Sequence, residues 1–238
     1  CGCGFGCKFC ATGAIGHKRN MTADEITDQI LYFYLAGHQI NSVSFMGMGE
    51  PFANPNLFDA LKILTNPSLF GLSQRRITIS TIGMIPGIKR LTRDFPQVNL
   101  AFSLHSPFEK QRSELMPINQ TYPLHKVMDA LDAHVANTKR RLFLAYIMLG
   151  GINDSAEHAK ALAHLILSRG ALSYLYHVDL IPYNATDKTA RKFTASNHEA
   201  IKNFSDILHS NRISVAIRMQ FGSDIGAGCG QLYADERD

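Results

Sequence analysis

The sequence has none of the segments that mark a membrane-spanning or secreted protein. Within its 238 residues, no run approaches the roughly 18 consecutive apolar residues of a membrane-spanning helix. No basic segment followed by an apolar one forms a secretion leader. Basic side chains exceed acidic ones by only four, which permits a polyanionic partner without requiring one. We therefore predict a cytoplasmic protein that contacts no membrane, and we expect it to be a monomer.

Linkers, short-period repeats and low-complexity tracts are also missing. Apolar residues make up 45% of the chain and charged residues 18%, a balance that is typical of a globular protein rather than a disordered one. We therefore predict a single domain over residues 1–238. Since the chain begins with Cys1 rather than Met, we expect it to start within a longer protein.

Cysteines are few, and their placement is uneven. Four of the five lie in the first ten residues, as Cys1, Cys3, Cys7 and Cys10, and the fifth is Cys229. An odd number of cysteines in a chain without a leader argues against a secreted disulfide framework. The clustering instead predicts a metal or redox site in a reducing compartment.

Strand-like and helix-like segments alternate along the whole chain. Capping-box sequences at 22–25 and 196–199 predict two of the helix starts. Alternating strands and helices favour a parallel sheet with right-handed crossovers, and about six units suit a barrel better than a sandwich. We predict an α/β fold, a partial (β/α)6 TIM-like barrel, with reactive residues at the carboxyl ends of its strands. The segments expected to form strands are 42–47, 76–80, 98–104, 142–149, 176–181 and 213–218.

The segment from Cys3 to Cys10 has the form CxxxCxxC. Glycines between the cysteines allow the backbone to fold tightly around a bound group. Three thiolates this close together need a cation to neutralise them. Zinc would require a fourth protein ligand, for which Cys1 and His17 are nearest, whereas an iron–sulfur cluster can leave one iron open. The spacing alone does not decide between zinc and iron–sulfur.

Polar residues and glycines stand where the predicted strands end. Taken singly, each has an ordinary structural explanation: a tight turn, a helix cap, a buried histidine or a turn residue. Their shared position at strand carboxyl ends, where a parallel barrel binds its ligands, favours a common site. These residues are Gly49 and Glu50, Ser80, Ser103 to His105, and Asn184.

Cys229 follows the last predicted strand and lies among residues with almost no side-chain bulk. A lone cysteine is usually a small buried residue in a packed loop. The flanking sequence here has no apolar pattern, and its glycines would let another molecule approach the sulfur closely. We therefore treat Cys229 as a candidate reactive thiol.

The CxxxCxxC motif, with Phe9 before the last cysteine, resembles the signature of the radical S-adenosylmethionine (SAM) superfamily. The resemblance implies a radical SAM partial barrel in which Cys3, Cys7 and Cys10 hold a 4Fe-4S cluster whose fourth iron binds S-adenosyl-L-methionine. It also implies contacts to that cofactor from Gly49, Glu50, Ser80, Ser103, Leu104, His105 and Asn184.

Further motifs narrow the resemblance to the RlmN/Cfr family of 23S ribosomal RNA adenine methyltransferases, and it runs from Cys1 to Tyr233. They are 47–50, 103–105, 116–119 and the loop around Cys229, taken together with 3–10. The resemblance is closer to the Cfr type, notably in 1–10 and 220–222. The family loop reads D-I-D-A-A-C-G-Q-L, and Gly226 and Gly228 depart from it. The Cfr type methylates carbon 8 of an adenosine in the peptidyl transferase centre and confers antibiotic resistance. The RlmN type methylates carbon 2, and also acts on tRNA.

The resemblance implies a mechanism in which Cys229 first accepts a methyl group from SAM. A radical made from a second SAM removes a hydrogen atom from that methyl group, and the carbon radical then adds to the adenine. A resolving cysteine, a proton-accepting carboxylate and an RNA-handling region are expected upstream of Cys1. An electron donor such as flavodoxin or ferredoxin is also expected. The competing hypotheses are another radical SAM enzyme, such as a glycyl-radical activase, and a zinc-stabilised RNA-binding module.

Overall fold

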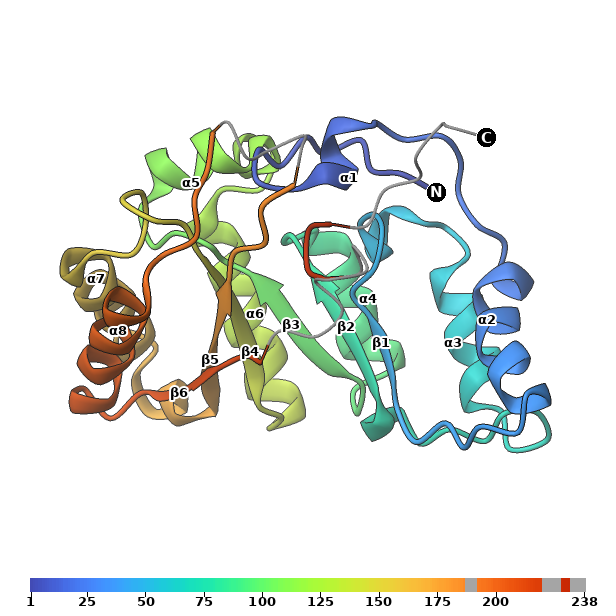
Figure 1. Cartoon of the computed structure of the whole chain (residues 1–238). Helices are drawn as coiled ribbons and strands as arrows, with labels where there is room; N and C mark the ends of the chain where they lie inside the picture. The colour runs from blue at the N-terminus through green and yellow to red at the C-terminus, as the bar shows by residue number, and fades with distance from the viewer. Residues whose placement is uncertain (187–191, 220–227, 232–238) are drawn as a thin grey trace.

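A computed structural model describes residues 1–186, 192–219 and 228–231, and these form one curved sheet covered by helices (Figure 1). All six strands are parallel, and each pairs with the strand that follows it in sequence, in the order β1-β2-β3-β4-β5-β6. The predicted α/β fold with six strand–helix units is therefore confirmed. The strands are β1 (Val43–Phe45), β2 (Ile77–Thr81), β3 (Asn99–Ser103), β4 (Leu142–Met148), β5 (Tyr176–Pro182) and β6 (Ser214–Ile217).

The helices are α1 (Ala11–Ala14), α2 (Ala23–Leu35), α3 (Leu57–Thr65), α4 (Ile85–Asp94), α5 (Glu109–Leu115), α6 (Leu124–Thr138), α7 (Ala156–Leu167) and α8 (His198–Ser210). Of these, α3, α4, α6, α7 and α8 lie in the crossovers between the strands and cover the outer face of the sheet, whereas α1 and α2 precede β1, and α1 and α5 lie at one end of the strands (Figure 1). Among the described residues, no helix has the length and apolar character needed to cross a membrane. Short 3-10 turns span Pro51–Ala53, Gln74–Arg76, Pro117–Gln120 and Gly170–Leu175.

The first predicted capping box is confirmed, and the second is wrong by one residue. At α2, the Thr22 hydroxyl accepts from the Glu25 amide, and the Glu25 carboxylate accepts from the Thr22 amide. At α8, the capping residue is Asn197 instead of Ser196. The Ser196 hydroxyl donates to the carboxylate of Asp154, 2.7 Å away, so it is not available to cap the helix.

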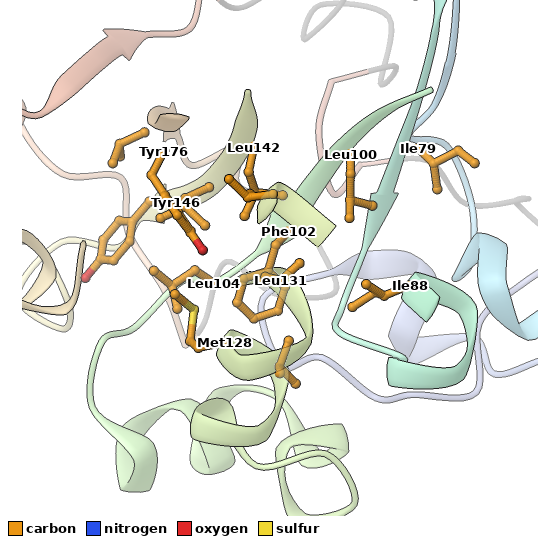
Figure 2. Close-up of a cluster of buried hydrophobic side chains, with 14 of the residues drawn as sticks. Ile79, Ile88, Leu100, Phe102, Leu104, Met128, Leu131, Leu142, Tyr146 and Tyr176 are labelled. Carbon is orange, nitrogen blue, oxygen red and sulfur yellow. The ribbon is translucent and has the colours of Figure 1, made fainter. Parts of the chain in front are cut away.

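The hydrophobic core lies between the sheet and the helices. Figure 2 shows strand side chains such as Leu100 and Phe102 packed against helix side chains such as Leu131, and all three are inaccessible to solvent. Side chains alternate along a strand, so this packing turns Ser103 to the opposite, concave side. The alternation along β3 therefore separates core residues from residues that can meet a ligand.

We predict that Leu131→Ala will destabilise the protein far more than Leu35→Ala. Leu131 is 0% exposed in α6, whereas Leu35 is 80% exposed at the end of α2. Loss of the buried side chain should lower the free energy of unfolding by about 2–5 kcal/mol, and loss of the exposed one by less than about 0.5 kcal/mol. Equilibrium denaturation in urea measures both, and equal effects would contradict the described packing.

Candidate active site

The described residues enclose a cavity of about 430 Å³ at the carboxyl ends of the strands. It brings the amino-terminal cysteine segment, the ends of the strands and the carboxyl-terminal cysteine to one place. Ten of the eleven predicted site residues line it: Cys3, Cys7, Cys10, Gly49, Glu50, Ser80, Ser103, His105, Asn184 and Cys229. Residues 220–222 and Gly226, on which part of the family resemblance rests, lie outside the described residues.

Leu104 is the predicted site residue that does not line the cavity. Its side chain is 0% exposed and belongs to the core between the sheet and the helices (Figure 2). Its amide donates to the carbonyl of Ala145 (3.0 Å), and its carbonyl accepts from Nε of Arg112 (3.1 Å). Both of its backbone groups are therefore already paired within the protein.

Backbone hydrogen bonds hold the segment from Cys3 to Cys10 in place. The amide of Lys8 donates to the carbonyl of Leu115 (3.0 Å), which fixes the segment to the end of α5. Directly after Cys10, the amide of Ala11 donates to the carbonyl of Gly230 (2.9 Å). The cysteine segment is thus joined directly to the loop that carries Cys229.

Two of the three clustered thiols resist ionisation as they stand. Burial raises the pKa of Cys7 to about 12, and burial also raises the pKa of Cys3. A metal group is therefore needed to hold Cys3 and Cys7 as thiolates. Across the described residues, no three Cys, His, Asp or Glu side chains converge closely enough to share one metal ion. Cys3, Cys7 and Cys10 nevertheless line one cavity, and three thiols are the donor set that a 4Fe-4S cluster with one open iron takes.

Glu50 is a buried carboxylate placed by the segment after β1. It accepts hydrogen bonds from the Thr81 hydroxyl (2.7 Å), the Ile82 amide (2.8 Å) and the Phe52 amide (3.2 Å). Burial outweighs these bonds and raises the pKa of Glu50 to about 7. Its neighbour Gly49 has a φ of +92°, and a Cβ there would lie 2.9 Å from the Gly2 carbonyl oxygen, so only glycine fits this turn.

His105 lies in the cavity wall as a neutral side chain. Burial, together with the charge of Arg112, lowers the pKa of His105 to about 3. Its Nδ1 accepts from the amide of Ile147 (3.0 Å), which leaves the ring proton on Nε2. The Phe9 ring meets it edge to face, with ring centres 4.9 Å apart. The φ of His105 is +58°, a strained conformation of the kind that concentrates at functional sites.

The loop around Cys229 packs against Asn184. The Asn184 side chain donates to the Cys229 carbonyl (3.2 Å), and the Gly228 amide donates to Oε1 of Gln231 (2.9 Å). A Cβ at position 228 would lie 2.7 Å from Nδ2 of Asn184 and 2.5 Å from Oε1 of Gln231. The family pattern has alanine at this position, and glycine here thus allows the backbone of the loop to lie closer to the side chains of Asn184 and Gln231. Cys229 is an exposed residue that lines the cavity.

Two arginines belong to this region and were not found by sequence reasoning. Arg218, directly after β6, lines the cavity and donates to Asp179 of β5 (2.8 Å). Arg112 of α5 is fully buried behind the strand ends. The position of Arg218 at a strand end was an available signal. Nothing in the sequence around Arg112 separates it from an ordinary surface arginine.

Comparison with known proteins gives consistent matches. The profile of the Radical SAM superfamily matches residues 1–166. The ribosomal RNA large subunit methyltransferase Cfr of Lachnoclostridium phytofermentans is 73% identical over 236 residues, which cover 99% of this chain and 69% of that protein.

Solved structures agree with these matches. The crystal structure of a radical SAM methyltransferase from Sphaerobacter thermophilus is 40% identical, with a TM-score of 0.90, covering 97% of this chain and 67% of that one. A domain of pyruvate-formate lyase-activating enzyme from Bacteroides vulgatus has a TM-score of 0.55 over 75% of this chain and 99% of its own. At 17% identity, this last likeness concerns the fold alone.

We predict that Glu50→Gln will flatten the pH dependence of stability between about pH 4.5 and 7. Because the pKa of Glu50 is raised in the folded chain, the folded state binds the proton more tightly than the unfolded state. Stability should therefore fall as pH rises through this window, by up to about 1.4 kcal/mol per pH unit, and then level off. Urea denaturation of the cluster-free chain at a series of pH values in this range measures how the free energy of unfolding changes with pH. If Glu50→Gln shows the same pH dependence as the wild type, the raised pKa of Glu50 is refuted.

Proposed function

The chain belongs to the Cfr family of radical SAM ribosomal RNA large subunit methyltransferases, and we propose that it methylates carbon 8 of an adenosine in the peptidyl transferase centre of 23S ribosomal RNA. Such methylation would confer resistance to ribosome-targeting antibiotics. Membership of the radical SAM superfamily implies a 4Fe-4S cluster and S-adenosyl-L-methionine. The observation that carries the proposal is that one cavity is lined by the three clustered cysteines and by Cys229.

Cys3, Cys7 and Cys10 would hold the cluster, and the cavity beside them would hold SAM. When bound, the cluster would supply the single electron that cleaves SAM into a radical. The protein's part is to position these groups and keep water away. Glu50 and Asn184 are buried polar side chains that line the cavity, and Ser80 of β2 and Ser103 of β3 line it as well. His105 is held neutral, so it would donate from Nε2 without adding charge.

Cys229 would carry the methyl group that is transferred to the adenine. Cys229 is exposed and lines the same cavity, so one SAM could methylate its sulfur and a second could then react beside it. The Ala11–Gly230 and Asn184–Cys229 hydrogen bonds support this role, because they fix the loop that carries the sulfur. A thiol far from the cluster ligands could not take part in both steps.

The partners would be 23S ribosomal RNA and an electron donor such as flavodoxin or ferredoxin. We place the protein in the cytoplasm, where ribosomes and these donors are found, and we expect it to act as a monomer. The chain would form the radical SAM catalytic core over residues 1–238, and the named relative is longer than the part that this chain matches.

We predict that Cys229→Ala will abolish RNA methylation and leave the cluster in place. The alanine removes the methyl acceptor but none of the three cluster ligands. Cys7→Ala should instead abolish both the cluster absorbance and the cleavage of SAM. Cys1→Ala is the matched control, because Cys1 does not line this cavity, and it should retain the cluster and at least half of the activity. Methylation of RNA by the Cys229→Ala variant would overturn the mechanism.

We predict that adenosine from cells expressing the full-length protein will carry the new methyl group on carbon 8. The 73% identity to a Cfr protein favours that carbon over carbon 2. Liquid chromatography with mass spectrometry separates the two products when 2-methyladenosine and 8-methyladenosine are run as standards. Detection of 2-methyladenosine alone would assign the chain to the RlmN activity instead.

A further inference from the structure

Arg112 is the largest fully buried side chain among the described residues, and it has no direct ionic partner there. Burying a guanidinium is costly unless its donors are satisfied and its charge has a use. Its hydrogen bonds all go to neutral oxygens: the carbonyls of Ile82 (2.8 Å), Ser103 (3.1 Å) and Leu104 (3.1 Å), and the side-chain amide of Asn119. The Phe102 ring lies 5.0 Å from the guanidinium carbon.

A carboxylate is close to Arg112 in sequence, but the hydrogen-bond network holds it one layer away. Glu109 accepts from the side chain of Asn119 (2.7 Å) and from the amide of Leu124 (2.9 Å). Asn119 therefore stands between the Glu109 carboxylate and Arg112. Glu109 is also exposed, so solvent screens its charge, whereas no solvent screens the guanidinium.

The guanidinium lies directly behind the wall of the cavity. Two residues whose carbonyls accept its hydrogen bonds also line that cavity. Ile82 directly follows β2, and Ser103 is the last residue of the adjacent strand β3. The same helix, α5, accepts the hydrogen bond from Lys8, which lies between the ligands Cys7 and Cys10. Arg112 thus ties β2, β3 and the cysteine segment into one rigid wall.

We infer that Arg112 is a positioning residue that also serves as the fixed counter-charge for the reduced cluster. An iron–sulfur cluster held by three thiolates is anionic, and one-electron reduction makes it more so. A buried, permanently positive group behind the cavity wall favours the reduced form, because little solvent lies between the charges. One electron enters from the reductant, and no bond is made or broken. The inference rests on the cluster of the proposed function, and its test does not involve RNA.

The test is the midpoint potential of the reconstituted cluster, measured by dithionite titration with electron paramagnetic resonance detection. Arg112→Gln removes the charge and should shift the potential to more negative values. The expected change is at least tenfold in the ratio of reduced to oxidised cluster, which is about 59 mV for one electron. Arg112→Lys keeps the charge and should stay close to the wild type. Arg140→Gln is the control, because that arginine contacts Asn99 at the opposite ends of the strands.

An unchanged potential in Arg112→Gln would overturn the inference. If that variant takes up no iron, the potentials of Arg112→Lys and Asn119→Ala test the inference instead, because both variants retain a positive charge behind the wall. In each, the ratio of reduced to oxidised cluster is expected to stay within threefold of the wild-type ratio. A tenfold or larger fall of that ratio in either variant would overturn the inference. A wild-type chain that binds zinc and no iron would instead refute the proposed function.

Discussion

The hydrogen bond from the Ala11 amide to the Gly230 carbonyl is the contact on which the proposed chemistry depends. It joins the segment that would hold the cluster to the loop that carries the acceptor thiol, although these lie near opposite ends of the chain. The contact exists because the amino-terminal cysteine segment and the residues that follow β6 line the same cavity. A parallel sheet whose strands follow one another in order brings all its carboxyl ends to one edge.

The cavity gathers more potential negative charge than positive charge. Four thiols and Glu50 line it, and Arg218, already paired with Asp179, is the single arginine or lysine among its described lining residues. Burial raises the pKa values of Glu50, Cys3 and Cys7, and so disfavours their negative charge until a cationic group binds. The fold therefore holds back much of the negative charge of this site, with Arg112 as a fixed positive charge behind the wall.

Much of this arrangement could be predicted from the sequence, because it follows from local pattern. The alternation of strands and helices specifies a parallel sheet, and polar residues at strand ends then share one edge. Leu104 shows the limit of that reasoning: it lies beside Ser103 in sequence, but strand alternation turns it into the core. The capping of α8 by Asn197 could not be predicted either, since Ser196 binds Asp154 from a distant loop. The burial of Arg112 depends on carbonyls from two strands, and no local pattern reports them.

The most direct test of this account is a crystal structure of the anaerobically reconstituted full-length protein with S-adenosyl-L-methionine. The account predicts a 4Fe-4S cluster bound by Cys3, Cys7 and Cys10, with the cofactor in the adjoining cavity and the Cys229 sulfur facing it. A cluster bound by other residues, or a Cys229 sulfur separated from the cofactor by the protein wall, would contradict it.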